Sequence, residues 1–148
     1  MKWIVFFSLI LSWSCAPKST NDENELAKIS NPEVMQFAIA GKSLYDSYCA
    51  NCHQVDGIGL GKLIPPIKES DYFKASVHRT VWLIRHGQKG EIVVNGETYD
   101  QPMPANPSLK PLEIAQITTY LYNIWGEQKG VISSSEVEKY LREKPENY

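Results

Sequence analysis

The feature that most constrains this chain is a five-residue motif, Cys49-Ala50-Asn51-Cys52-His53. Two cysteines three positions apart lie on one side of a helical turn, so both thiols can reach the same bound group. Cys-x-x-Cys-His is the attachment sequence of c-type haem, in which each thiol forms a thioether with one vinyl group and the histidine binds iron. The motif therefore predicts one covalent haem, held by Cys49 and Cys52, with His53 as an axial ligand of the iron.

Three other uses of this motif have less support in the sequence. A zinc site needs about four ligands, usually including a second Cys or His pair, but the remaining cysteine, Cys15, ends an apolar run near the start of the chain. A thioredoxin-like dithiol is expected in a βαβ setting, whereas the patterns here are helical. A disulfide between Cys49 and Cys52 would close a very small loop and would contribute little stability. Haem attachment accounts for both thiols and the histidine.

An apolar run from Trp3 to Trp13 follows one basic residue, Lys2. It is shorter than the about 20 residues that span a hydrocarbon layer, so residues 1–14 are interpreted as a signal peptide. The run ends in small residues and Cys15, which resembles the lipobox of bacterial lipoproteins, where the cysteine is acylated and becomes the N-terminus. The alternatives to such a lipoprotein signal are a plain secretory signal and a buried hydrophobic helix.

Lipidation of Cys15 would give an exported protein that a lipid anchors to the periplasmic or outer-surface face of a membrane. Residues 15–30 are polar and lack aromatic side chains, so they are predicted to be the lipidated N-terminus and a flexible tether. Fifteen Lys and Arg residues against seventeen Asp and Glu residues give a formal charge of -2. The balance offers no excess positive charge for a phosphate backbone, which disfavours nucleic acid as a partner.

Apolar residues recur at helical spacing in three places within residues 31–126, which predicts an all-α domain with about three main helices. Asn31-Pro32 is a start signal for the first helix, and Pro111 is a start signal for the last helix. The middle helix lies between them along the chain and ends at Gly87. Gly41 falls on the apolar face of the first helix, where it costs about 1 kcal/mol against alanine. It is best explained by the close approach of another helix.

Two smaller elements complete the expected organisation. Asn95-Gly96 is typical of a tight turn and predicts a small hairpin near residues 92–99. Ser133 and Glu136 have the spacing of a capping box, so the extension over residues 127–148 is predicted to contain a short helix that folds back onto the domain.

With these elements in place, the region from Asn31 to Trp125 resembles a bacterial class I cytochrome c. The likeness rests on the order and spacing of several motifs around the haem motif: Gly41, Tyr45, Gln54 to Gly59, Pro65-Pro66-Ile67, Gln101 to Ala105, Ile117 and Tyr120. The resemblance implies a cytochrome c fold whose first and last helices cross beside the haem. It also implies that the Pro65 carbonyl accepts a hydrogen bond from His53, which fixes the ring. Lys110 departs from the Ser or Thr that often caps the last helix of this family.

Met103 is predicted to be the second axial ligand, by elimination and by this resemblance. Met1 leaves with the signal peptide, and Met35 lies on the first helix, where packing is its expected role. Prolines on both sides of Met103 stiffen its loop. The rival is ligation by two histidines, through His78 or His86.

A haem iron held by His53 and Met103 has no open position for a substrate, so the sequence predicts an electron carrier and not an enzyme. Expected partners are a redox protein donor and acceptor associated with the membrane, with no small-molecule substrate. The chain could instead be a haem-bearing subunit of a larger respiratory or dehydrogenase complex. A haem enzyme or a sensor would require a displaceable Met103. Arg85, Trp82 and Tyr99 are candidates for hydrogen bonds to haem propionates, although packing or solvation explains each equally well.

Overall fold

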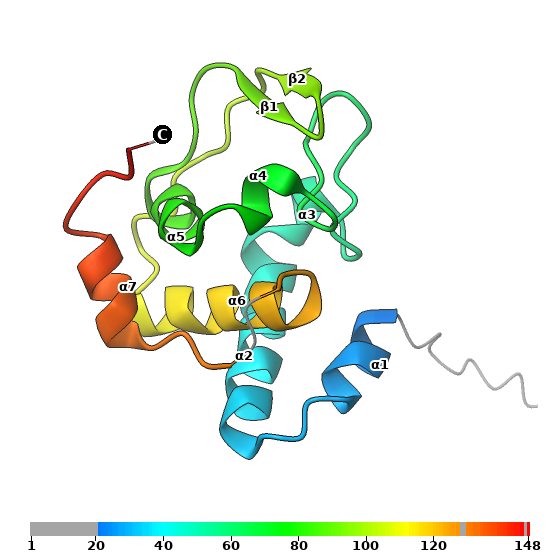
Figure 1. The fold of residues 1–148 in the computed structure, drawn as a ribbon, viewed down its shortest axis with the longest axis vertical. Helices are drawn as coiled ribbons and strands as arrows, with labels where there is room; N and C mark the ends of the chain where they lie inside the picture. Colours follow the sequence, from blue (N-terminus) through cyan, green and yellow to red (C-terminus); the bar gives the residue numbers. More distant parts are fainter. Residues whose placement is uncertain (1–20, 128–129, 147) are drawn as a thin grey trace, which may run out of the picture.

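The computed structural model describes residues 21–127, 130–146 and 148, and this part of the chain is mostly helical with one small hairpin (Figure 1). The prediction of a helical domain with three main helices is confirmed, and those helices are α2, α5 and α6. The elements are α1 (Asn21–Ala27), α2 (Pro32–Tyr48), α3 (Ala50–His53), α4 (Asp71–Lys74), α5 (Val77–His86), β1 (Ile92–Val94), β2 (Glu97–Tyr99), α6 (Pro111–Ile124) and α7 (Ser134–Tyr140).

Helices α2 and α6 cross, and their contact is the main packing interface of the fold (Figure 1). The side chain of Asn31 accepts hydrogen bonds from the backbone N–H groups of Glu33 and Val34 and so caps α2. A Cβ atom added at Gly41 would lie 2.8 Å from the Cβ of Tyr120, and closer still to the carbonyl oxygen of Gln116. The predicted close approach of a partner helix at Gly41 is therefore confirmed.

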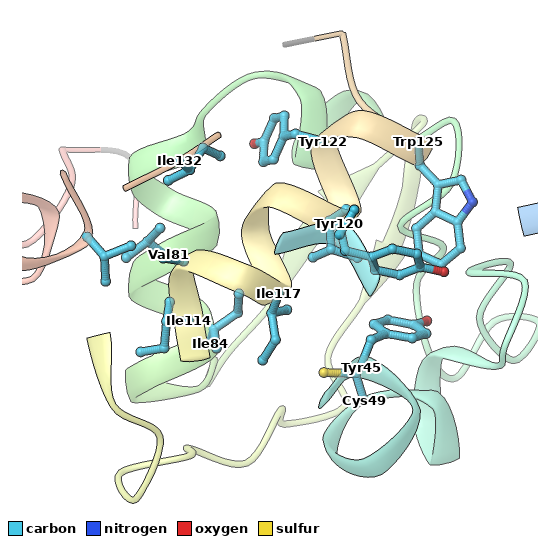
Figure 2. Packing of buried hydrophobic residues seen from close by; sticks show 14 of the residues in the cluster. Tyr45, Cys49, Val81, Ile84, Ile114, Ile117, Tyr120, Tyr122, Trp125 and Ile132 are labelled. Atoms are coloured by element: carbon cyan, nitrogen blue, oxygen red, sulfur yellow. The ribbon is translucent and has the colours of Figure 1, made fainter. Parts of the chain in front are cut away.

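An aromatic cluster of Tyr45, Tyr120 and Trp125 fills the end of this crossing (Figure 2). The ring centroids of Tyr45 and Trp125 are 5.3 Å apart, and those of Tyr45 and Tyr120 are 5.6 Å apart. Such tilted pairs contribute beyond the area they bury. The Tyr45 hydroxyl also donates a hydrogen bond to the Gln54 carbonyl at 2.6 Å. The cluster thereby fixes the chain that follows the Cys-x-x-Cys-His motif.

The hairpin β1–β2 lies where the sequence predicts it. The strands are antiparallel, with Val94 opposite Glu97, and the turn residues Asn95 and Gly96 have φ angles of 52° and 81°. Two reciprocal hydrogen bonds tie the turn to the start of α4: the Asp71 N–H donates to Asn95 Oδ1 at 3.0 Å, and the Asn95 N–H donates to Asp71 Oδ1 at 2.8 Å. The hairpin is therefore held against the helical body.

One prediction is wrong: part of the expected tether is helical. Residues 21–27 form α1, which contacts both α2 and α6. Leu26 is only 8% exposed and belongs to the core cluster, and Ile29 packs against that cluster. Two apolar residues three positions apart suffice because the α2–α6 crossing already offers them a surface to cover. The signal peptide, Cys15 and the rest of the tether lie outside the described residues.

The extension folds back onto the domain through α7. The Ser133 hydroxyl accepts a hydrogen bond from the Glu136 N–H, and the Glu136 carboxylate accepts one from the Ser133 N–H, so the capping box is present as predicted. Val137 is fully buried, and α7 packs against α5 and α6. None of the described helices combines the length and apolar composition needed to cross a membrane.

Candidate haem site

One cavity brings together the predicted site residues of the domain. Its empty space amounts to about 1000 Å³, open solvent at its mouth included, and its lining comes from helices α2 to α6, both strands and the connecting loops. Cys49, Cys52, His53, Pro65 and Met103 all line it, although up to 54 positions separate them along the chain. Its lining is mainly aliphatic and aromatic, as is usual for a cavity that buries a large apolar ligand.

The motif occupies the corner between α2 and α3. Cys49 is both the last cap of α2 and the first cap of α3, and the His53 N–H donates to the Cys49 carbonyl at 2.9 Å. Cys49 is 8% exposed, whereas Cys52 is exposed. Burial raises the pKa of the Cys49 thiol to about 12, and the nearby Cys52 adds to this rise. This environment disfavours a thiolate at Cys49 and suits a sulfur that carries no charge, such as a thioether.

The His53 ring is oriented by the loop that faces it. Its Nδ1 lies 3.2 Å from the Pro65 carbonyl oxygen, so Nδ1 carries the proton and donates, and Nε2 of the neutral ring keeps its lone pair. Burial lowers the pKa of His53, opposed by the hydrogen bond to Pro65. The hydrogen bond that the resemblance implied is therefore present, and the neutral form that a metal requires is favoured.

Gly59 has a role that sequence reasoning missed. A Cβ atom there would lie 2.7 Å from the Pro65 carbonyl oxygen, and closer still to that of Ile64. The Gly59 N–H donates to the His53 carbonyl at 3.0 Å. Only glycine lets the backbone at residue 59 approach the backbone of Ile64 and Pro65 closely enough for the Pro65 carbonyl to face the imidazole. The sequence shows the glycine but not the segment that it faces.

Met103 is held by the end of α5. The Gln88 N–H donates to the Met103 carbonyl at 2.9 Å, and the Met103 N–H donates to the Gln88 carbonyl at 3.0 Å. Further along the loop, the side-chain amide of Asn106 donates to the Ile84 carbonyl, and the Arg85 guanidinium donates to the Pro107 carbonyl. The loop after the hairpin is therefore fastened at several points to one helix end.

The rival ligands are engaged elsewhere. His78 Nε2 donates to the carbonyl oxygens of Tyr140 and Glu143, at 2.9 and 2.8 Å. His86 is exposed, and its ring packs on Trp82 with 4.0 Å between ring centroids. Neither histidine lines the cavity, and neither does Met35 on α2. Of the alternatives considered, Met103 alone lines the cavity.

The candidates for propionate contacts divide into two groups. Tyr99 lines the cavity, whereas Trp82 and Arg85 lie on α5 beside Leu83 and Ile84, which line it. Trp82 Nε1 and Arg85 Nε are buried and have no hydrogen-bond partner among the described residues. Unpaired buried donors are costly unless a ligand satisfies them. A porphyrin fits this combination of an apolar cavity, two thiols and an imidazole, and no contact places the two unpaired donors of α5 at the cavity.

These features define a small helical domain built around one covalently attached c-type haem. The family model described as Cytochrome c matches residues 38–125. The chain therefore belongs to the cytochrome c family, and its cofactor is haem c with its iron.

Two relatives illustrate the range of this family. Cytochrome c-552 of Thermus thermophilus is 30% identical over 95 residues, which are 62% of this chain and 72% of that protein. The Cbb3-type cytochrome c oxidase subunit FixP of Sinorhizobium medicae is 29% identical over 99 residues, which are 65% of this chain and only 33% of the subunit.

Proposed function

We propose that this protein carries single electrons between redox proteins at a membrane surface, with Cys49 and Cys52 as the haem thioethers and His53 and Met103 as axial ligands. The observation that carries the proposal is that these four residues line the same cavity. Bound there, haem c supplies a one-electron couple between ferric and ferrous iron, and a methionine ligand raises its potential.

The protein residues have the task of keeping the coordination unchanged in both oxidation states. The Pro65 carbonyl orients His53, and the backbone bridge to Gln88 holds Met103. A filled coordination sphere leaves no position for a substrate, which supports a carrier over a haem enzyme or a gas sensor. Fixed ligands also keep the structural change on electron transfer small.

Transient redox partners or a permanent complex would both suit this domain. Brief electron-transfer encounters need only small contact areas, and a shuttle between two membrane proteins is the proposal that we favour. The relative named as an oxidase subunit makes a bound subunit the second candidate. Both share the same haem chemistry and differ in the lifetime of the contact.

The purified wild-type protein tests the carrier proposal. Its haem is expected to survive acid-acetone extraction, because both thioethers are covalent. Redox titration should give one reversible one-electron transition. The spectrum should be six-coordinate and low-spin in both the oxidised and the reduced protein, and the oxidised protein should show a near-infrared sulfur-to-iron band. A five-coordinate spectrum that responds to peroxide or nitrite would instead indicate an enzyme.

Membrane tethering is the second part of the proposal. Acylation of Cys15 would leave only residues 15–20 before α1 begins at Asn21. Such a segment reaches at most about 20 Å when fully extended. Because α1 packs on α2 and α6, the haem domain would stay close to the membrane, which raises its effective concentration for partners there.

Replacing Cys15 by serine is expected to abolish acylation. The variant should be released from membranes or remain unprocessed, because a single residue carries the whole anchor. Intact-mass measurement of the mature protein checks this, with Ser19→Ala as the control in the same segment. An N-terminus elsewhere, with no acyl group on wild-type protein, would contradict the proposal.

A further inference from the structure

The end of the extension contacts the end of α5. After α7 the chain runs back past α5 (Figure 1), and the Tyr148 hydroxyl donates a hydrogen bond to the Gly87 carbonyl at 2.7 Å. The Tyr148 ring packs edge-on against Trp82, with 6.1 Å between ring centroids. Earlier in the extension, His78 Nε2 donates to the Tyr140 and Glu143 carbonyls. The extension is therefore fixed to both ends of α5.

Gly87 connects this contact to the Met103 loop. It ends α5 with a φ angle of 76°, and its N–H donates to the Leu83 carbonyl at 2.8 Å. A Cβ atom at Gly87 would lie 2.8 Å from the Ala105 nitrogen, and closer still to the Met103 carbonyl oxygen. The backbone of Gly87 is thus packed directly on the backbone of the loop that carries the proposed ligand.

One peptide group joins the two contacts. The carbonyl of Gly87 and the N–H of Gln88 belong to the same planar unit. The carbonyl accepts from Tyr148, and the N–H donates to the Met103 carbonyl at 2.9 Å. A hydrogen bond at one end of a peptide group orients it and polarises its other end, so the second bond is strengthened.

We infer that Tyr148 is a positioning residue for Met103, acting through the Gly87–Gln88 peptide. This inference rests on the proposed function, in which the Met103 sulfur is the sixth ligand of the iron. The hydroxyl of Tyr148 fixes the orientation of the Gly87–Gln88 peptide group, whose N–H is hydrogen-bonded to the Met103 carbonyl. Loss of that hydroxyl leaves the side chain of Met103 untouched but lets its loop open more often. The extension then serves to retain the ligand as well as to cover apolar surface.

A conservative variant isolates the hydroxyl. Tyr148→Phe in the full-length haem protein keeps the ring against Trp82 and removes only the hydrogen bond to Gly87. Added imidazole competes with the Met103 sulfur for the iron, and its affinity measures how often the loop opens. We expect imidazole to bind roughly three- to ten-fold more tightly than to wild type, because a hydrogen bond of this kind contributes about that factor.

Amide hydrogen exchange measures opening of the Met103 loop independently of ligand binding at the iron. The Gln88 and Met103 amides should exchange faster in Tyr148→Phe by a similar factor, while amides of the α2–α6 crossing keep their wild-type rates. The matched control is Tyr140→Phe, in the same extension, where the ring stacks on His78. It should change neither imidazole affinity nor these two amides.

The outcomes distinguish failure of the proposed Met103 ligation from failure of the positioning role of Tyr148. If oxidised wild-type protein lacks the sulfur-to-iron band, ligation by Met103 is wrong and the inference is overturned with it. If the band is present and Tyr148→Phe leaves both imidazole affinity and the two amides unchanged, only the positioning role is overturned. Equal changes in Tyr148→Phe and Tyr140→Phe would also overturn it, since they would reflect general loosening of the extension.

Discussion

Replacing Met103 by alanine is expected to remove the near-infrared sulfur-to-iron band and open the sixth coordination position to water or added ligands. Imidazole should then bind at least about tenfold more tightly, because no internal ligand competes for the iron. The potential should fall by a measurable part of the about 0.8 V range that axial ligands control, since the thioether favours ferrous iron. Spectroscopy and redox titration of the oxidised and reduced variant check both effects.

Matched variants separate Met103 from its rivals. Met35→Leu should leave the spectrum unchanged, because Met35 lies on α2 and does not line the cavity. His86→Asn should do the same, since its ring packs on Trp82 outside the cavity. Persistence of the sulfur band in Met103→Ala, or its loss in His86→Asn, would show that another residue binds the iron.

The fold was predictable where its signals are local. Asn31 and the Ser133–Glu136 pair mark helix starts through hydrogen bonds within a few residues, and Pro111 marks one through its fixed φ angle. At α6 the Glu113 carboxylate accepts the Lys110 N–H at 2.7 Å, so the departure at Lys110 did not displace the start of the helix. The Cys-x-x-Cys-His motif is local as well, which is why the cofactor could be inferred from five residues.

What the sequence did not reveal depends on distant segments. Helix α1 exists because Leu26 covers surface made by α2 and α6, and no pattern within residues 15–30 records that surface. The roles of Gly59 and Gly87 depend on which backbone lies against them. The contact between Tyr148 and Gly87 joins positions 61 residues apart. Pairing over such separations is set by tertiary packing, which propensity and spacing do not encode.

Replacing Gly41 by alanine gives opposite expectations from helix propensity and from packing. Propensity alone predicts a gain of about 1 kcal/mol, since alanine is the better helix former. Packing predicts a loss, because the new methyl group would meet the Gln116 backbone and the Tyr120 Cβ at less than van der Waals distance. Backbone cannot move aside as a flexible side chain can, so we expect the free energy of unfolding to fall by more than about 3 kcal/mol.

The loss should extend to the haem site. Separating α2 from α6 would pull Tyr45 away from Tyr120 and Trp125 and weaken its hydrogen bond to Gln54, just beyond His53. Guanidinium unfolding of the oxidised protein, followed by the sulfur-to-iron band and by circular dichroism, measures both effects. Gly90→Ala is the control: its φ angle of 84° makes alanine strained, but nothing lies within 4 Å of the added methyl, so it should cost only about 1 kcal/mol. A Gly41→Ala protein as stable as wild type would mean that the two helices do not approach as closely as their backbones indicate, and the frame proposed for the haem cavity would have to be revised.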